Sequence, residues 1–348
     1  MSQKALIIGI NYTGSKHELG GCINDAYNVR NFLVNERGFS DDGENIVMMT
    51  DEPNNEESWR YPTHENMMSA MQWLIKDSGP NDSLWLSYSG HGSQTADTNG
   101  DAPGGYDDTI CPVDFETSGQ IYSTALHDTL VMPLHNRARL TILFDCCHSG
   151  SACELPYVYR PDADGNIVSI ATMAKNALLE GSRLIDSTKD FLDGEDGRGF
   201  SLSRETFQEA GTLFSGFSGL AKDFGNVAQA AWTGGEGEEN EPNEDGLVKA
   251  DHEWIDEHSA VVKDVWMFSG CADNQTSADT KIGGMATGAM SWAFITTMQQ
   301  LGEPSYIDAS CKLTKLDLVA MKTNKQNYSQ IPQLSCGGEY DLDQKIVL

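Results

Sequence analysis

The sequence is poor in basic residues. Its 348 residues include 23 Lys and Arg against 52 Asp and Glu, which gives a formal net charge of −29. Such a charge argues against nucleic acids and anionic membranes as partners, because both repel an acidic surface. Basic peptides are the partners that this surface attracts.

Long apolar runs are also missing, and no segment approaches the roughly 18 apolar residues of a membrane span. The chain starts directly in a strand-like run at residues 4–10, which predicts no signal peptide. Its eight cysteines then indicate free thiols in a reducing compartment, the cytoplasm with the nucleus as a further location. No Cys-x₂-Cys or His-x₃-His spacing is present, which argues against a zinc site.

Strand-like and helix-like segments alternate along the first half of the chain. This order predicts an α/β fold, a sandwich in which a central, mostly parallel β-sheet carries helices on both faces. The predicted strands are 4–10, 45–49, 84–88, 140–144 and 261–268, and the predicted helices are 23–36, 63–76, 127–135, 286–301 and 307–321.

We expect a single domain over residues 1–348, with a flexible, acidic insert at about 183–258. The insert contains a run, 233–245, of acidic residues and glycines without a base, which is typical of a solvated loop. Residues 94–108 are rich in Gly and Asp and predict a polar loop outside the core. Residues 330–348 predict one or two closing strands.

Reactive residues follow two of the predicted strands. Strand 140–144 leads into Asp145 to Gly150 (DCCHSG), and strand 84–88 leads into Ser89 to Gly92 (SGHG). In α/β sheets the chemistry lies beyond the carboxyl ends of the strands, so Cys147 and His91 would face each other there. A cysteine with a histidine about fifty residues upstream is the caspase-like arrangement. Cys146 and His148 are the alternatives, although two successive residues cannot both face His91.

These two motifs together resemble the motif pair of the metacaspases, caspase-like cysteine peptidases that cut after Arg or Lys. The similarity runs from Lys4 to about Leu334 and weakens between roughly 180 and 260. It suggests a type I-like member without the N-terminal extension that many of them carry. Four further segments match in the same order: Gly21–Asp25, Pro112–Phe115, Ser269–Asp279 and Ile331–Leu334.

The resemblance implies a role for each residue of the motif pair. Cys147 would be the nucleophile that forms an acyl-enzyme, and His91 the base that later protonates the leaving amine. The family motif Asp-X-Cys-His-Ser-Gly places the nucleophile second, which leaves Cys146 packed. The backbone N–H groups of Gly92 and Cys147 would form the oxyanion hole.

Substrate selection is assigned by the same resemblance to two carboxylates, Asp25 and Asp145. Paired carboxylates at a pocket floor select Arg or Lys by charge and by bidentate hydrogen bonds. Cys22 and Ser89 would line the same pocket. The alternatives are an ordinary helix N-cap for Asp25 and a strand-end hydroxyl for Ser89.

Many metacaspases need calcium, and the resemblance transfers this property only in part. Asp107 matches one ligand, and Asp108 lies beside it. The next two aspartates of the family are Ser123 and Thr124 here, and a fourth is Glu154. Because Ca²⁺ takes six to eight oxygens and usually several carboxylates, the expected calcium stimulation depends on a rearranged site. The alternative is that these acids are solvated loop residues.

The insert also predicts self-processing, because exposed flexible segments are where chains are nicked. Lys249 is the first choice, with Lys222 and Arg204 as the others. We expect a monomer that acts on protein and peptide substrates with Arg or Lys before the cut. A non-proteolytic interaction or protein-quality-control protein on the same fold is the alternative, since a fold does not fix its chemistry. Cell death and stress responses are roles that the sequence does not distinguish.

Overall fold

The computed structural model describes residues 2–96, 106–146, 152–161, 167–169, 262–270, 279–282, 285–323, 332–338 and 340–348. All of them belong to one compact unit made of Met1–Ser169 and Ala250–Leu348. Cys147, the insert and the three expected self-cleavage residues lie outside the described residues. A single domain with an insert therefore stays a prediction.

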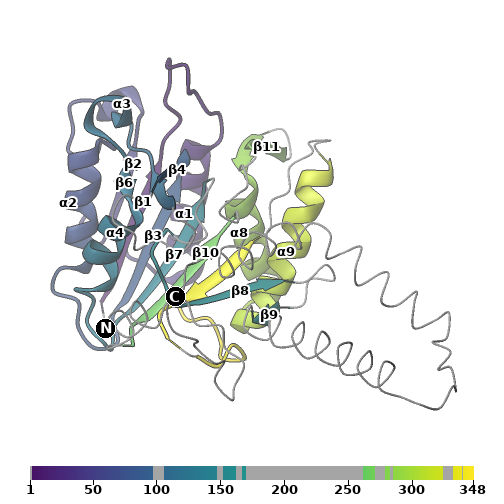
Figure 1. Ribbon diagram of the computed structural model, residues 1–348. Helices are drawn as coiled ribbons and strands as arrows, with labels where there is room; N and C mark the ends of the chain where they lie inside the picture. The colour runs from purple at the N-terminus through teal and green to yellow at the C-terminus, as the bar shows by residue number, and fades with distance from the viewer. Residues whose placement is uncertain are drawn as a thin grey trace, which may run out of the picture. The chain divides into compact units, whose positions relative to one another are not determined.

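Eight strands form the central sheet. In chain order they are β1 Gln3–Gly9, β2 Ile46–Thr50, β3 Ser83–Ser89, β7 Arg139–Asp145, β8 Tyr157–Pro161, β9 Ile167–Ser169, β10 Asp264–Ser269 and β13 Gln333–Cys336. Their order across the sheet is β2-β1-β3-β7-β10-β13-β8-β9 (Figure 1). The first five are mutually parallel, and the last three are antiparallel to their neighbours. The mostly parallel sheet is confirmed.

Helices cover both faces of this sheet (Figure 1). Helices α1 Cys22–Arg37, α8 Ala289–Leu301 and α9 Tyr306–Thr323 pack on one face. Helices α2 His64–Ile75 and α4 Ser123–Leu126, followed by the π-helical turn η2 His127–Val131, pack on the other. The predicted three-layer α/β sandwich is therefore present.

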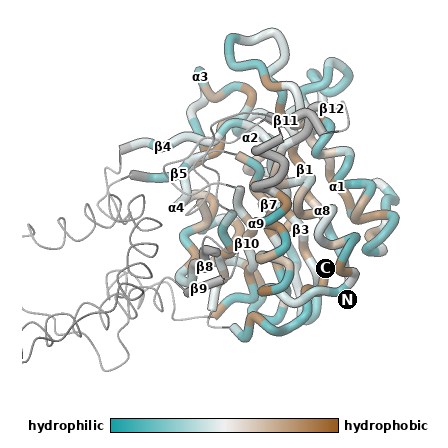
Figure 2. The backbone as a smooth tube through the Cα atoms, turned by 90° about the vertical axis from the view of Figure 1, so that its right-hand side faces the viewer, coloured by the Kyte–Doolittle hydropathy of each residue, from teal (hydrophilic) through white to brown (hydrophobic). Residues whose placement is uncertain are grey.

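The two-residue period of the strands divides the apolar side chains between the two layers. In β3, Leu84 and Leu86 join the cluster under α2, whereas Trp85 joins the cluster under α1 and α8. All seven residues of β3 are buried. Burial on both faces explains why the central strands read as continuous hydrophobic runs, which are brown in Figure 2.

The start of α2 follows its sequence signal. Thr63 is the N-cap, and its side chain accepts a hydrogen bond from the backbone N–H of Asn66 at 3.3 Å. That bond satisfies one of the N–H groups left without a partner at a helix start. The predicted start of this helix, at residue 63, agrees with the observed N-cap.

The prediction of a polar loop at 94–108 is wrong at both of its ends. Strands β4 Gly92–Ala96 and β5 Tyr106–Ile110 pair antiparallel, and β6 Ile121–Tyr122 extends them to a small second sheet. Asp107 and Asp108 are buried rather than solvated. Gln94 Nε2 donates to Asp108 Oδ1 at 2.9 Å, and such a partner lowers the free-energy cost of burying a carboxylate.

Two expected helices have other bounds in the structure, and one hairpin was not predicted. The helix expected at 127–135 starts earlier, as α4, and η2 ends at Val131, ahead of Pro133. Helix α8 begins three residues late because β12 Met285–Gly288 pairs with β11 Asp279–Ile282. The hairpin of β8 and β9 was not predicted. Within the described residues after 331, β13 is the one strand of the closing segment.

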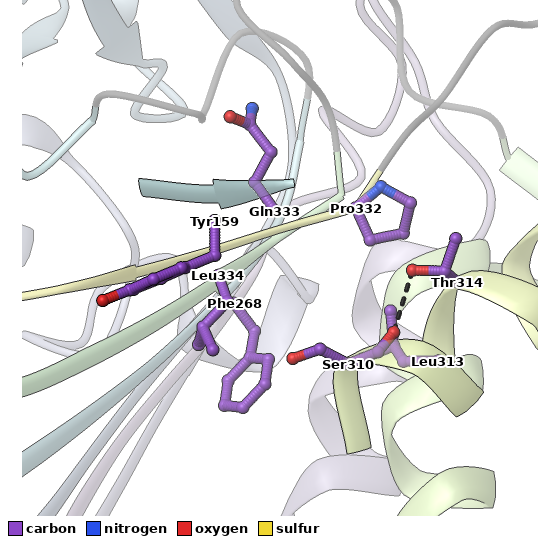
Figure 3. Close-up of a pocket in the computed structure, with 8 residues that line it drawn as sticks. All are labelled: Tyr159, Phe268, Ser310, Leu313, Thr314, Pro332, Gln333 and Leu334. Atoms are coloured by element: carbon purple, nitrogen blue, oxygen red, sulfur yellow. Dashed lines mark hydrogen bonds between the residues drawn. The ribbon is translucent and has the colours of Figure 1, made fainter. Parts of the chain in front are cut away.

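A small hollow lies between α9 and the strands β8, β10 and β13 (Figure 3). Its volume is about 10 Å³, and Phe268, Leu313 and Leu334 are among its lining residues. This is room for about one water molecule, so the hollow does not accept a peptide. Among the helices that the structure describes, none is long and apolar enough to cross a membrane.

Candidate active site

The carboxyl edge of the parallel strands places the two motifs side by side. Gly9 of β1 pairs with Ser89 of β3, and Ser89 pairs with Asp145 of β7. His91 follows Ser89 by two residues, and Cys147 follows Asp145 by two residues. Adjacent strands are about 4.8 Å apart. The segments that lead to His91 and Cys147 therefore start from two residues, Ser89 and Asp145, that lie side by side. Ser89 and Asp145 are thereby brought together as the sequence predicted.

Cys146 is fully buried in the core cluster on the α2 face of the sheet, together with Tyr88 and Phe144. A cysteine enclosed by apolar side chains is an inert structural thiol. The expectation that Cys146 is packed agrees with this position.

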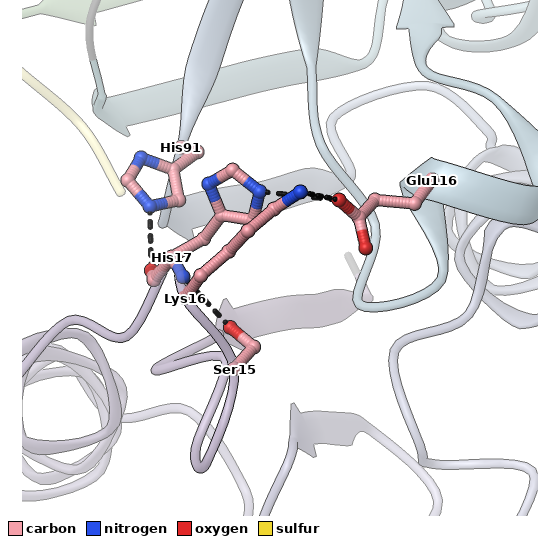
Figure 4. A network of polar contacts seen from close by, with 5 residues as sticks. All are labelled: Ser15, Lys16, His17, His91 and Glu116. Carbon is pink, nitrogen blue, oxygen red and sulfur yellow. Dashed lines mark hydrogen bonds and ion pairs between the residues drawn. The ribbon is translucent and has the colours of Figure 1, made fainter.

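His91 is partly buried just beyond β3, and a hydrogen bond orients its ring. Nε2 of His91 lies 2.8 Å from the backbone oxygen of His17 (Figure 4). A carbonyl oxygen only accepts, so Nε2 carries a hydrogen and Nδ1 is left as the nitrogen that can exchange a proton. No pattern in the sequence predicted this contact with His17.

The segment that supplies the His17 carbonyl is tied to helix α3 Phe115–Ser118. Glu116 Oε1 lies 2.8 Å from Lys16 Nζ and 3.3 Å from His17 Nε2 (Figure 4). Two hydrogen bonds lower the pKa of Glu116, and the one from Lys16 has the larger effect, ahead of the one from His17. Glu116 is about a hundred residues away in sequence, so spacing alone could not have predicted this ion pair.

Asp25 and Asp145 meet at the N-terminus of α8. The backbone N–H of Gly288 donates to both oxygens of Asp25, at 3.0 and 2.9 Å, and that of Ser291 donates to Asp145 Oδ2 at 2.7 Å. Both carboxylates are buried, with 1% and 4% of their surface exposed. The N–H groups at a helix start have no partner within the helix, and here the two carboxylates supply partners for them.

The alternative reading of Asp25 as the N-cap of its own helix is wrong. The N-cap of α1 is Gly21, which makes no side-chain capping bond. Asp25 lies in the first turn of α1 and binds the start of α8 instead. Gly288, whose N–H binds Asp25, also lies against Asp145, because a Cβ built on Gly288 would collide with the Asp145 carboxylate. The two acids are therefore close together.

The other predicted pocket residues lie at the same edge. Cys22 is the first residue of α1 and is buried, and a side chain on Gly9 would collide with the Cys22 carbonyl. Ser89 is buried at the end of β3. Gly92, the predicted oxyanion-hole residue, begins β4 and pairs with Ile110.

The expected calcium residues are only partly gathered. Thr124 Oγ1 donates to Glu154 Oε1 at 3.2 Å. Ser123 is buried at the start of α4, and Asp107 and Asp108 are buried in β5. In the part of the chain that the structure describes, no three or more His, Cys, Asp or Glu residues are grouped so as to hold a metal ion. These residues by themselves do not form a complete calcium site.

Comparison with known proteins agrees with this geometry. A model of the metacaspase family, described as the metacaspase peptidase C14 domain, matches residues 3–156. Metacaspase-1 of Debaryomyces hansenii is 41% identical over 346 residues, covering 99% of this chain and 67% of the relative. Metacaspase-1 of Saccharomyces cerevisiae is 41% identical over 349 residues, covering 99% and 69%. A solved structure of a Geobacter sulfurreducens protein is 20% identical, with a TM-score of 0.48 over 99% of this chain and 97% of the other.

The caspase-like sandwich, with aligned strands that lead into the SGHG and DCCHSG motifs, places this protein in the class of cysteine peptidases. The chain belongs to the metacaspase family. It is therefore a hydrolase of the cysteine peptidase type, and its substrates are proteins or peptides.

Proposed function

We propose that this peptidase is an endopeptidase that cuts after Arg or Lys, with Cys147 as nucleophile and His91 as its base. The observation that carries the proposal is the register of β3 and β7. It pairs Ser89 with Asp145, and each motif reaches its reactive residue after two further positions. The hydrogen bond from His91 Nε2 to the His17 carbonyl supports the assignment of Nδ1 as the base.

In the proposed reaction, His91 Nδ1 takes the proton of the Cys147 thiol and the thiolate attacks the scissile carbonyl carbon. The oxygen then carries the negative charge, and the N–H groups of Gly92 and Cys147 stabilise it. The imidazolium of His91 gives its proton to the leaving amine as the C–N bond breaks. Water, deprotonated by His91, then hydrolyses the thioester and releases the thiol.

The proposed preference for Arg or Lys is supported by the buried pair of Asp25 and Asp145. The N–H groups of Gly288 and Ser291 hold their carboxylates. These donors are neutral and do not compensate the charge of a carboxylate, whereas a cationic side chain would compensate it and an acidic side chain would not. Cys22 and Ser89 are proposed to line the same pocket.

The test is hydrolysis of fluorogenic peptides that end in Arg, Lys or Asp. We expect turnover of the Arg and Lys peptides only, and loss of turnover in the Cys147→Ala and His91→Ala proteins. The Cys146→Ala protein is the matched control and should remain active. Turnover of the Asp peptide, or undiminished activity of Cys147→Ala, contradicts the proposal.

We further propose that calcium stimulates the enzyme without taking part in the chemical steps. Support comes from Thr124 and Glu154, two of the expected donors, which the hydrogen bond between them brings together. Activity of the Arg peptide measured with millimolar Ca²⁺ and with a chelator tests the proposal, and Glu154→Gln should weaken the response. Equal rates in both solutions would exclude stimulation.

Self-processing in the insert is proposed at Lys249, with Lys222 and Arg204 as further sites. It depends on the same specificity for basic residues. Mass spectrometry of the active protein should find a cut after Lys249, and Lys249→Gln should remove it. An intact chain with full activity contradicts the proposal.

We propose that the enzyme is a monomer located in the cytoplasm and, additionally, the nucleus. The thiols of Cys153, Cys311 and Cys336, none of which is bonded to another cysteine, support a reducing location. Sedimentation of the active protein tests the monomer, and a second, faster species with all of the activity would contradict it.

A further inference from the structure

Two buried tyrosines lie behind the proposed catalytic histidine. Tyr12 follows β1 and is 2% exposed, and Tyr88 lies inside β3 and is fully buried. Tyr12 has a left-handed backbone with φ of 52°. This conformation is unfavourable for a bulky residue and persists where the surrounding contacts enforce it.

The two hydroxyl groups bind both backbone groups of His91. The His91 N–H donates to the Tyr12 hydroxyl at 3.0 Å, and the Tyr88 hydroxyl donates to the His91 carbonyl at 2.7 Å. The ring of Tyr12 also lies against the imidazole, with centroids 4.8 Å apart and planes tilted by 40°. One tyrosine therefore contacts both the backbone and the ring of the histidine.

The remaining hydrogen-bonding groups of the tyrosines go to Cys111. The Tyr12 hydroxyl donates to the Cys111 carbonyl at 2.5 Å, and the Cys111 N–H donates to the Tyr88 hydroxyl at 3.2 Å. Cys111 N–H also donates to the His91 carbonyl at 3.0 Å. The two hydroxyls also lie 3.1 Å from each other, and the Tyr88 hydroxyl lies 3.1 Å from the Cys111 carbonyl. Together these contacts link the base of the β4–β5 hairpin to the sheet.

Two local features keep this arrangement in place. Gly90 leaves room for it, because a Cβ there would lie 2.6 Å from the Tyr88 hydroxyl and 3.1 Å from that of Tyr12. Burial raises the pKa of Tyr12 and of Tyr88 well above the usual value near 10. Both hydroxyls therefore keep their protons and donate them throughout the pH range in which the enzyme is folded.

We propose that Tyr12 and Tyr88 are positioning residues that fix the direction of the His91 imidazole through its backbone and ring. They act through His91, whose backbone and ring they contact. The inference depends on the proposed Cys147 and His91 pair, because a fixed ring direction matters only if the ring exchanges protons. Removal of either hydroxyl should slow the chemical step and leave substrate binding unchanged.

The experiment compares Tyr12→Phe and Tyr88→Phe with Thr314→Val. Thr314 is a buried residue of α9 whose hydroxyl donates to the Ser310 carbonyl at 2.8 Å. Its loss therefore removes one buried hydroxyl bond elsewhere. We expect kcat for the Arg peptide to fall about tenfold to a hundredfold in the tyrosine variants, with KM nearly unchanged. The rate at which iodoacetamide alkylates Cys147 should fall with kcat, because a misdirected imidazole activates the thiol less. Thr314→Val should retain the wild-type kcat and alkylation rate.

The outcomes separate this inference from the proposed function. If Cys147→Ala and His91→Ala abolish turnover and both tyrosine variants behave like Thr314→Val, the positioning role is wrong and the dyad stands. If Cys147→Ala keeps its activity, the dyad itself is wrong. If Tyr12→Phe does not fold, Tyr88→Phe decides, and unchanged kcat and alkylation in that folded variant overturn the inference.

Discussion

Gly288 is the residue at which the pocket acids and α8 come closest. Its N–H binds Asp25, and its missing side chain leaves space for the carboxylate of Asp145. A larger residue at this position would displace the Asp145 carboxylate, which is proposed to bind the cationic side chain of the substrate. At the scale of single residues, the proposed specificity of the site therefore depends on a position without a side chain.

We predict that Gly288→Ala destabilises the protein by about 1–3 kcal/mol, because the new methyl group overlaps a buried carboxylate. It should also lower kcat/KM for the Arg peptide about tenfold or more, since the displaced Asp145 no longer meets the cationic side chain. Denaturant unfolding and peptide kinetics measure the two effects. Gly79→Ala is the control, because a Cβ there would lie 3.5 Å from Asp82 Oδ2, an ordinary contact. Equal kinetics for the two variants would contradict the prediction.

Sequence reasoning at this scale found residues that belong to short local motifs. Ser89, His91 and Asp145 are recognisable because each follows a buried strand directly. Tyr12, Glu116 and Gly288 were missed, since their roles arise only when segments distant in sequence come together. Asp25 was found from the family motif, while its actual partner, the N-terminus of α8, had no signal in the sequence.

The segment between β1 and α1 has an element-scale role, because its His17 carbonyl orients the His91 ring. An exposed ion pair of Lys16 with Glu116 holds this segment. We predict that Glu116→Gln lowers kcat most at low ionic strength. In about 1 M salt, where the screening length is about 3 Å, the wild-type pair is itself weakened and the difference should shrink.

Glu303→Gln is the matched control for this prediction. Glu303 forms a similarly exposed ion pair with Lys345, at 2.9 Å. Its loss should leave kcat unchanged at every salt concentration. If the loss of kcat in Glu116→Gln is the same at every salt concentration, or if Glu303→Gln loses as much kcat, the segment does not depend on this ion pair.

Helix α2 offers a stability test at the same scale. Thr63→Ala removes the N-cap oxygen and should destabilise the protein by about 0.5–2 kcal/mol. The 3.3 Å bond to Asn66 favours the lower half of this range. The midpoint of urea unfolding should fall while its slope stays constant. Thr63→Ser keeps the oxygen and should recover most of the loss, and an equally destabilised Thr63→Ser would rule out the capping explanation.

Elements were predictable where one periodicity dominated. The buried strands and the amphipathic helix α2 follow their hydrophobic patterns. The β4–β5 hairpin was missed because Asp107 and Asp108 read as solvated, although β5 buries both. Strands β11 and β12 were missed because short pieces of three to five residues carry little periodic signal.

The molecule as a whole should lose stability in alkaline solution. Burial raises the pKa of Cys336 to about 12 and that of Cys153 still further, and it also raises those of Tyr12 and Tyr88. In the unfolded chain the thiols lose their protons at about pH 8.5 and the tyrosine hydroxyls at about pH 10. The unfolded state then binds fewer protons than the folded state, so the free energy of unfolding falls as the pH rises.

Urea unfolding between about pH 7.5 and about pH 10.5 measures this loss. Cys336→Ala should be less stable at neutral pH, because it leaves a cavity. It should also show a shallower decline above about pH 8.5, because one buried thiol no longer contributes. An equally steep decline in the variant would mean that Cys336 is not among the groups responsible.

The order of the strands along the chain also determines when each part of the site is made during translation. The neighbour of β7 on its far side, β10, begins only at Asp264, and the N–H that binds Asp25 belongs to Gly288. A ribosome that has completed both reactive motifs has therefore still to produce the part of the chain that anchors the two acids. The nascent chain therefore completes its pocket only after the long segment between Asp145 and Gly288 has also been made.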